Sequence, residues 1–194
     1  MSPRGTPQRV LVVTASPKFP DVLRACLPPA QFQPMIPAAS SGEAKRLLLN
    51  AGFDLVVIDD PVGRESGSQL ALDIASQHSS LGILLLVRAE LFDQASARVE
   101  EKGIVTLPKP TTRQMIYSAA KMLTAIRNKL LAAQRETLDL RERMEEIRLV
   151  NQAKWFLVEN RQMTEPEAHR YIEKAAMDRC VRKRVIAEEL LRAE

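Results

Sequence analysis

The chain has 194 residues, of which 45% are hydrophobic and 27% charged, and its net charge is +4 at pH 7. This composition supplies a packed core and excludes a disordered chain. The apolar runs are far shorter than the roughly 20 residues of a membrane-spanning helix, and the longest are Val10–Val13, Leu55–Ile58 and Ile83–Val87. The two cysteines, Cys26 and Cys180, are too far apart for a zinc or redox motif. We therefore expect a cytoplasmic protein with no metal centre and no membrane partner.

The first 124 residues alternate apolar strands with amphipathic helices. We predict strands at Arg9–Thr14, Phe32–Ile36, Asp54–Asp59, Gly82–Val87 and Ile104–Leu107. Pro34 and Pro37 interrupt and end the second strand, which we therefore place at a sheet edge. The predicted helices are Phe19–Leu27, a helix from the capping signature Ser40–Glu43 to Leu49, Ser66–Ser76 and Leu91–Glu101. Five βα units joined by short turns predict an α/β fold with a flavodoxin-like, doubly wound, five-stranded parallel sheet.

Polar residues follow several of these strands, at the sheet edge where function is found in such folds. The segments DLVVIDDPVGRESG (Asp54–Gly67) and LPKP (Leu107–Pro110) make residues 7–124 resemble the receiver domain of two-component response regulators. The resemblance implies that Asp59 is the phosphoacceptor position and that Lys109 is the lysine that pairs with the phosphate.

The chain departs from the receiver pattern where a receiver holds Mg²⁺. A receiver has an acidic pair after the first strand and a hydroxyl residue after the fourth, whereas this chain has Thr14-Ala15-Ser16 and Val87. Phosphoryl transfer to a carboxylate needs a hard cation to offset the charge repulsion. We therefore expect a pseudo-receiver with no cofactor, in which Asp59 is paired with Lys109. The alternative is an active Asp59 with weak Mg²⁺ binding, phosphorylated by a histidine kinase.

A long helix is expected from about Thr112 to about Asn160, because no proline occurs between Thr112 and Pro166. Within it, residues of an a/d heptad pattern follow one another at spacings of three and four: Leu123, Ile126, Leu130, Ala133, Thr137, Leu140, Met144 and Ile147. This pattern predicts a parallel homodimeric coiled coil over residues 123–147. The alternative is a helix packed on its own domain. The next a/d positions are polar, so we expect the seam to end near Ile147.

Residues 148–194 have the pattern of a small all-α bundle of three amphipathic helices. The three expected apolar faces are Val150, Ala153 and Leu157; Ala168, Ile172, Ala175 and Ala176; and Val181, Val185, Ile186 and Leu190. The second helix begins at the capping sequence Thr164–Glu167, and a bend at Asp178–Cys180 precedes the third.

The segment of about Arg143–Leu191 resembles the ANTAR domain, the RNA-binding module of bacterial antitermination regulators. The resemblance rests on Gln152-Ala153-Lys154 with Leu157, Glu167-Ala168, Ala176-Met177, and Arg182-Lys183-Arg184 before Ile186-Ala187. Trp155 and His169 depart from the usual pattern. The resemblance implies that the ligand is a hairpin in nascent mRNA.

Basic side chains provide the expected RNA contacts in this bundle. We place Arg179, Arg182 and Lys183 on one face of the third helix and Arg170 and Lys174 on the second. The other expected contacts are Lys154, Trp155 and Arg184. An exposed Trp155 could stack on an unpaired base, as is common in the recognition of RNA loops. The alternatives are a solvated helix face for the charges and a dimer contact or partial core position for Trp155.

We therefore predict a dimeric antitermination factor that is not an enzyme. It would consist of a receiver-like domain (1–122), a coiled-coil linker (123–147) and an ANTAR-like RNA-binding domain (148–194). Two alternatives remain. One is a regulator controlled by phosphorylation of Asp59, and the other is a protein-interaction switch that a regulatory protein partner holds and whose nucleic-acid binding is secondary.

Overall fold

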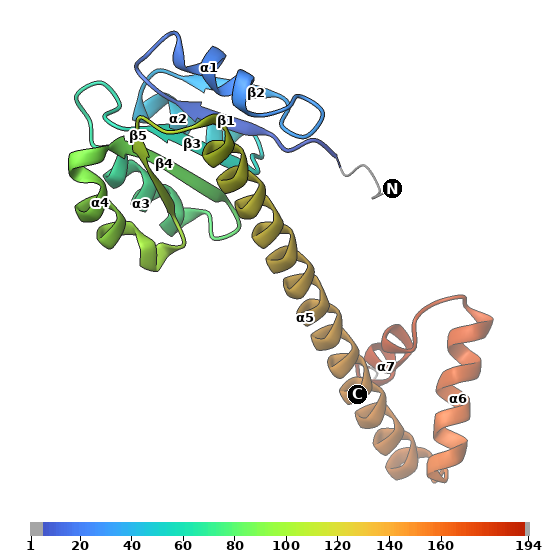
Figure 1. The fold of residues 1–194 in the computed structure, drawn as a ribbon. Helices are drawn as coiled ribbons and strands as arrows, with labels where there is room; N and C mark the ends of the chain where they lie inside the picture. Colours follow the sequence, from blue (N-terminus) through green and yellow to red (C-terminus); the bar gives the residue numbers. More distant parts are fainter. Residues whose placement is uncertain (1–5, 193–194) are drawn as a thin grey trace. The chain divides into compact units, whose positions relative to one another are not determined.

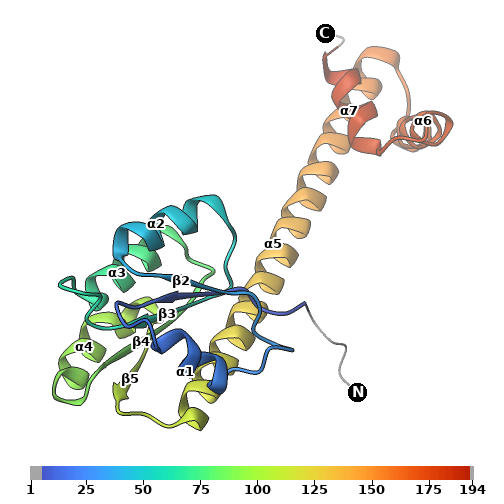
Figure 2. The same ribbon diagram turned by 90° about the horizontal axis from the view of Figure 1, so that it is seen from above.

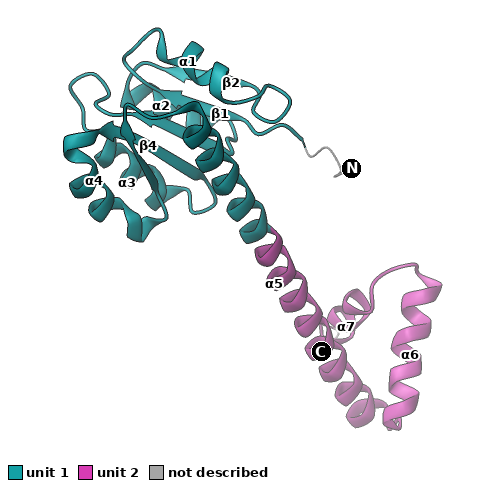
Figure 3. Cartoon of the chain, viewed as in Figure 1, with its two compact units in different colours: residues 1–131 teal, residues 132–194 magenta. Residues whose placement is uncertain are grey.

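The computed structural model describes residues 6–192; the outermost residues of the two expected terminal domains, 1–5 and 193–194, lie outside this range. The chain forms two compact units, Met1–Leu131 (unit 1) and Ala132–Glu194 (unit 2), shown in Figure 3. The boundary falls inside the segment expected to form the coiled coil, and one helix, α5 (Arg113–Arg161), runs through both units. Within the described range, no helix is long and apolar enough to cross a membrane.

Unit 1 is a five-stranded parallel sheet in the order β2-β1-β3-β4-β5 (Figures 1 and 2). The strands are β1 (Val10–Val13), β2 (Met35–Ala38), β3 (Leu55–Asp59), β4 (Gly82–Arg88) and β5 (Val105–Lys109). The helices are α1 (Phe19–Cys26), α2 (Ser41–Asn50), α3 (Gly67–Gln77), α4 (Phe92–Val99) and the first part of α5, with 3-10 turns at Ala89–Leu91 and Glu100–Lys102. The expected doubly wound α/β fold is confirmed.

The sheet is buried on both faces, which explains its nearly continuous apolar strands. Alternate strand residues point to opposite faces, so Leu11 and Val56 lie in one core with α2, α3 and α4. Val12 and Val57 lie in the other core, which α1 and the first turns of α5 cover. Short βα connections leave the carboxyl ends of the strands together at one edge, and the polar residues gather there.

The edge position of β2 is confirmed, but its predicted bounds are wrong. The strand lies at Met35–Ala38 instead of Phe32–Ile36, and Pro37 is paired with Val12 inside it. A proline is tolerated there because an edge strand has one side without ladder partners. Phe32 precedes the strand and is buried against Tyr117, with the two ring centroids 6.5 Å apart.

Unit 2 is a helical bundle of the end of α5, α6 (Glu165–Asp178) and α7 (Lys183–Arg192). Its core consists of Val150, Ala153, Leu157, Ala168, Ile172, Ala176, Ile186, Ala187 and Leu190. Most of these residues were predicted. Val185 was placed wrongly, since it is 37% exposed and Ala187, two residues later, is buried instead. The third helix begins at Lys183, two residues after Val181, so a different set of its residues faces the core.

Capping interactions set the two ends of α6. At the start, Thr164 and Glu167 form the expected capping box, in which the Thr164 backbone N–H donates to Glu167 Oε2 at 2.8 Å. At the end, Cys180 adopts a left-handed conformation with φ 51°, and the Val181 N–H bonds to the Ala176 carbonyl at 3.0 Å. This arrangement is a Schellman motif, which ends a helix and reverses the chain.

Leu123 belongs to the core of unit 1, so its predicted place in the dimer seam is wrong. Its side chain is 5% exposed and packs with Ile116, Ala119 and Ala120 below the sheet. A heptad pattern cannot distinguish a residue that faces its own sheet from one that faces a second helix. The exposed part of the stripe therefore begins at Ile126, whose side chain is 57% exposed.

We expect Leu123→Ala to lower the free energy of unfolding of unit 1 by about 2–5 kcal/mol, because it leaves a cavity in a closed core. Chemical denaturation followed by circular dichroism measures the loss. Met122→Ala is the matched control, since Met122 is 51% exposed on the same turn, and it should change the free energy by less than about 0.5 kcal/mol. Equal effects of the two substitutions would contradict the placement of Leu123.

Candidate nucleic-acid interface and receiver site

The carboxylate of Asp59 lies at the end of β3 and is fully engaged by two neighbouring side chains. Lys109, at the end of β5, places its Nζ 2.5 Å from Asp59 Oδ1. Thr14, which follows β1, donates its hydroxyl to Asp59 Oδ2 at 2.8 Å. The Asp59 side chain is 15% exposed. The pair expected from the sequence is therefore present, and Thr14 occupies the remaining carboxylate oxygen.

The second aspartate of this segment, Asp60, has a structural role. It is buried, and its Oδ1 accepts a hydrogen bond of 2.5 Å from the backbone N–H of Gly67, at the first turn of α3. A Cβ at Gly67 would lie 2.8 Å from that oxygen, so the close approach requires glycine. The negative charge also stabilises the N-terminal end of the helix. Asp60 therefore has little freedom to bind a cation.

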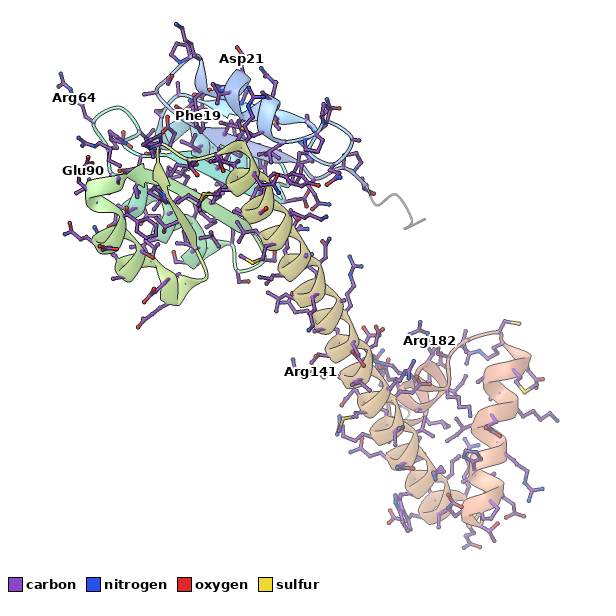
Figure 4. The ribbon with its side chains drawn as sticks, viewed as in Figure 1. Phe19, Asp21, Arg64, Glu90, Arg141 and Arg182 are labelled. Atoms are coloured by element: carbon purple, nitrogen blue, oxygen red, sulfur yellow. The ribbon has the colours of Figure 1, made fainter. Side chains whose placement is uncertain are left out.

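The residues at this edge do not fit a Mg²⁺ ion. Asp21, the first acid after β1, lies on α1 in Figure 4, is 78% exposed and pairs with Arg24 at 2.6 Å. Val87 is buried and carries no hydroxyl. In the range 6–192, no group of three or more acidic, histidine or cysteine side chains is arranged to hold a metal. Both carboxylates at this edge, Asp59 and Asp60, already accept hydrogen bonds from the protein.

We therefore expect no phosphorylation when the full chain is incubated with a small phosphodonor and Mg²⁺. Intact-mass measurement checks this outcome, and Asp59→Asn is the matched control. A stoichiometric phosphate adduct that forms on the natural chain and disappears in Asp59→Asn would overturn the assignment as a pseudo-receiver.

In unit 2, most of the basic residues expected to contact RNA are already paired with carboxylates. The four pairs are Lys154 with Glu165 at 2.5 Å, Arg184 with Glu188 at 2.7 Å, Arg179 with Glu189, and Lys183 with Glu173. The predicted common face of Arg179, Arg182 and Lys183 is wrong. Arg179 caps the end of α6 and Arg182 lies in the turn before α7, because the Schellman motif separates the two helices.

Three residues of α6 lie one turn apart in a row, Glu165, His169 and Glu173, and the two glutamates link the three helices. Lys154 of α5 bonds to Glu165, which lowers the pKa of this carboxyl group. Lys183 of α7 bonds to Glu173 and, with a smaller contribution from His169, lowers the pKa of that group as well. The two glutamates therefore stay charged across the neutral range and hold their lysines within the bundle.

The outer face of α6 carries cations without such partners. Arg170 and Lys174 are exposed one turn apart, and neither forms a salt bridge with a residue of the described range. Beside them, Arg161 of α5 lies over the Tyr171 ring, 5.5 Å from its centroid, and donates to the Tyr171 hydroxyl at 3.2 Å. Arg161 and Tyr171 were not predicted as contacts from the sequence. The feature that could have indicated them is the aromatic residue next to Arg170.

Arg182 and Trp155 occupy other surfaces of unit 2. Arg182, labelled in Figure 4, lines a groove of about 350 Å³ together with Asp139, Glu142 and Glu146 of α5. Arg143 and Arg184 line the same groove, so the groove carries as many arginines as acids. The Trp155 side chain is 63% exposed, as expected.

Comparison with known proteins agrees with these two units. The signal receiver domain of an HD domain-containing protein from Pseudomonas fluorescens Pf-5 is 20% identical, with a TM-score of 0.59 over 68% of this chain and 97% of that one. A CheY-like receiver domain protein from Methanospirillum hungatei JF-1 is 17% identical, with a TM-score of 0.55 over 64% of this chain and 98% of that one. These likenesses show the fold of unit 1.

Residues 138–191 match the ANTAR domain. Unit 1 therefore has a receiver-like fold and is followed by a segment that matches the ANTAR domain, which confirms both resemblances. The chain is also similar to the transcriptional regulatory protein PdtaR of Mycobacterium tuberculosis, with 28% identity over 187 residues. The aligned region covers 96% of this chain and 91% of that protein.

Proposed function

We propose that the chain is a homodimeric, cytoplasmic antitermination factor that binds a hairpin in nascent mRNA through its ANTAR domain and catalyses no reaction. One observation carries the proposal: within this domain, the outer face of α6 presents unpaired cations next to an aromatic ring. Binding the hairpin would stabilise it against the competing terminator, so that the polymerase reads on.

The outer face of α6 combines the two contacts that single-stranded RNA loops use. Arg170 and Lys174 can neutralise phosphates without first giving up a carboxylate. Tyr171 is 38% exposed and already carries a guanidinium on its ring, which suits stacking with an unpaired base. Phosphate contacts give affinity, and the stacked base gives preference for a loop over a duplex.

The paired cations have a different role in this proposal. For Lys154, Arg179, Lys183 or Arg184 to bind phosphate, each must leave a glutamate that it already neutralises. Exchange of one anion for another gains little at an exposed site. Arg182 lies in a groove beside three acids of α5. These five residues therefore shape the surface and contribute less to affinity than Arg170 and Lys174.

The dimer would form through the exposed stripe of α5. Ile126 and Leu130 in unit 1 and Leu140, Met144 and Ile147 in unit 2 are between 42% and 71% exposed. Five large apolar side chains at heptad spacing suit a second copy of the same helix. Glu136 comes just before Thr137, which is at an a position, and Arg141 comes just after Leu140, which is at the next d position. In a parallel pair, Glu136 of one copy would therefore face Arg141 of the other, with opposite charge.

Control of the protein would not depend on phosphorylation of Asp59. Lys109 and Thr14 already fill the positions around its carboxylate, which favours regulation by a protein that contacts the receiver surface. A histidine kinase would be the partner only if Asp59 were active.

Sequencing of the RNA that copurifies with the full chain tests the function directly. Enrichment of hairpins upstream of terminators, together with salt-dependent binding to these hairpins and not to duplex DNA, is the expected result. Binding to duplex DNA with equal affinity would favour a DNA-binding regulator, and the absence of nucleic acid would favour a protein-interaction switch.

We expect the double substitution Arg170→Ala/Lys174→Ala to flatten the plot of log K against log salt by about 1.4, since each lost single-stranded phosphate contact contributes about 0.7. Lys183→Ala/Arg184→Ala changes the net charge equally and is the matched control. Its slope should stay close to that of the natural chain. Binding to an isolated hairpin over a salt series measures both slopes. If only the control variant flattened, the RNA surface would lie at the start of α7.

We expect Leu140→Glu/Met144→Glu to convert the dimer to monomers, because two unpaired charges in a seam cost several kcal/mol. Sedimentation velocity measures the mass. Leu138→Glu is the control, since Leu138 is exposed on another face of the same helix and should leave the dimer intact. An unchanged mass of the double variant would show that α5 does not hold the dimer.

A further inference from the structure

Trp155 lies on the side of α5 that faces away from the bundle. Ala153, two residues earlier, is fully buried in the core of unit 2, and two residues turn an α-helix by about 200°. The α6 residues of the RNA face, Arg170 and Lys174, lie opposite the buried Ile172 on the outside of α6. Trp155 and the proposed RNA face therefore occupy different surfaces of unit 2.

Trp155 continues the exposed apolar stripe of α5. Counting 100° per residue, it lies within about 20° of the direction of Met144, which is 11 positions earlier. Met144 is 71% exposed and Ile147 61%, so the three side chains form one exposed row with Asn151 between them.

The structure explains why the heptad pattern hides this continuation. The next d position after Ile147 is Lys154, but this side chain is only 16% exposed and is held by Glu165 of α6. The exposed row instead passes from Ile147 to Asn151 and from there to Trp155, in two steps of four. Such a four-residue insertion is a stutter, which locally straightens a supercoil while keeping the seam on one side of the helix.

We propose that the self-association face extends through this stutter and that Trp155 packs against a second copy of the chain. The inference rests on the proposed dimer. A second copy suits the row because a symmetric parallel pair places Asn151 and Trp155 opposite their own equivalents, as it does the apolar residues before them. Glu136 and Arg141 favour the same parallel register. The ANTAR domains of the dimer are then held together at Trp155, and their α6 faces are free for RNA.

Trp155 is the only tryptophan of the chain, so its fluorescence tests the proposal in the full-length protein. In the dimer, confirmed by sedimentation at the same concentration, acrylamide should quench the emission several-fold less than in the monomeric Leu140→Glu/Met144→Glu variant. A hairpin taken from the copurified RNA should leave the emission unchanged. Trp155→Ala should raise the dimer dissociation constant about tenfold or more, whereas Leu138→Ala should not.

The outcomes distinguish failure of the proposed dimer from failure of the proposed Trp155 contact. A natural chain that stays monomeric at all concentrations would overturn the proposed dimer and this inference with it. A dimer whose tryptophan is as accessible as in the monomeric variant would overturn the inference alone. Quenching by RNA in such a dimer would assign Trp155 to base stacking.

Discussion

The structure depends on one helix, α5, whose side chains repeat every 3.6 residues. The same helix packs against the sheet in unit 1 and against α6 and α7 in unit 2. In unit 1 its first turns bury Leu123 below the sheet, and in unit 2 its last turns bury Ala153 and Leu157 in the bundle. Between these contacts its large apolar side chains are exposed. Each of these exposed apolar side chains lacks the stabilisation of about 1.5–3 kcal/mol that its burial would give. This unmet burial is the physical argument for the proposed dimer.

Many charged side chains of this protein are neutralised by ion pairs within the same chain. The Asp59 carboxylate is neutralised by Lys109, and four basic residues of unit 2 are neutralised by glutamates. A basic sequence segment is therefore a poor guide to a basic surface. The small net charge of +4 conceals an uneven distribution, in which Arg170 and Lys174 stand out because neither forms a salt bridge with a described residue. In the proposed function, RNA affinity would follow the unpaired cations and not the total number.

Local patterns predicted much of this fold from the sequence. The alternation of strands and helices, the edge strand, the capping box at Thr164 and the pairing of Asp59 with Lys109 each follow from nearby residues or from a recognised family pattern. The separation of Arg179 from Lys183 also reflects the turn at Cys180 that ends α6, but the errors otherwise share one cause. The burial of Leu123, the separation of Arg179 from Lys183 and the glutamate partners of the basic residues depend on which side each helix turns toward its neighbours. That rotation is decided by tertiary packing, which a single sequence does not display.

The turn that ends α6 has a practical consequence. Cys180 sits at its left-handed position and is exposed, whereas Cys26 is buried under the sheet, where burial raises the pKa of its thiol. A protonated, covered thiol reacts slowly with maleimides and related reagents. The natural chain therefore offers one accessible attachment point for a probe, in the same unit as its single tryptophan. Energy transfer between the two would report the distance between α5 and the turn that ends α6 in solution without any engineered residue.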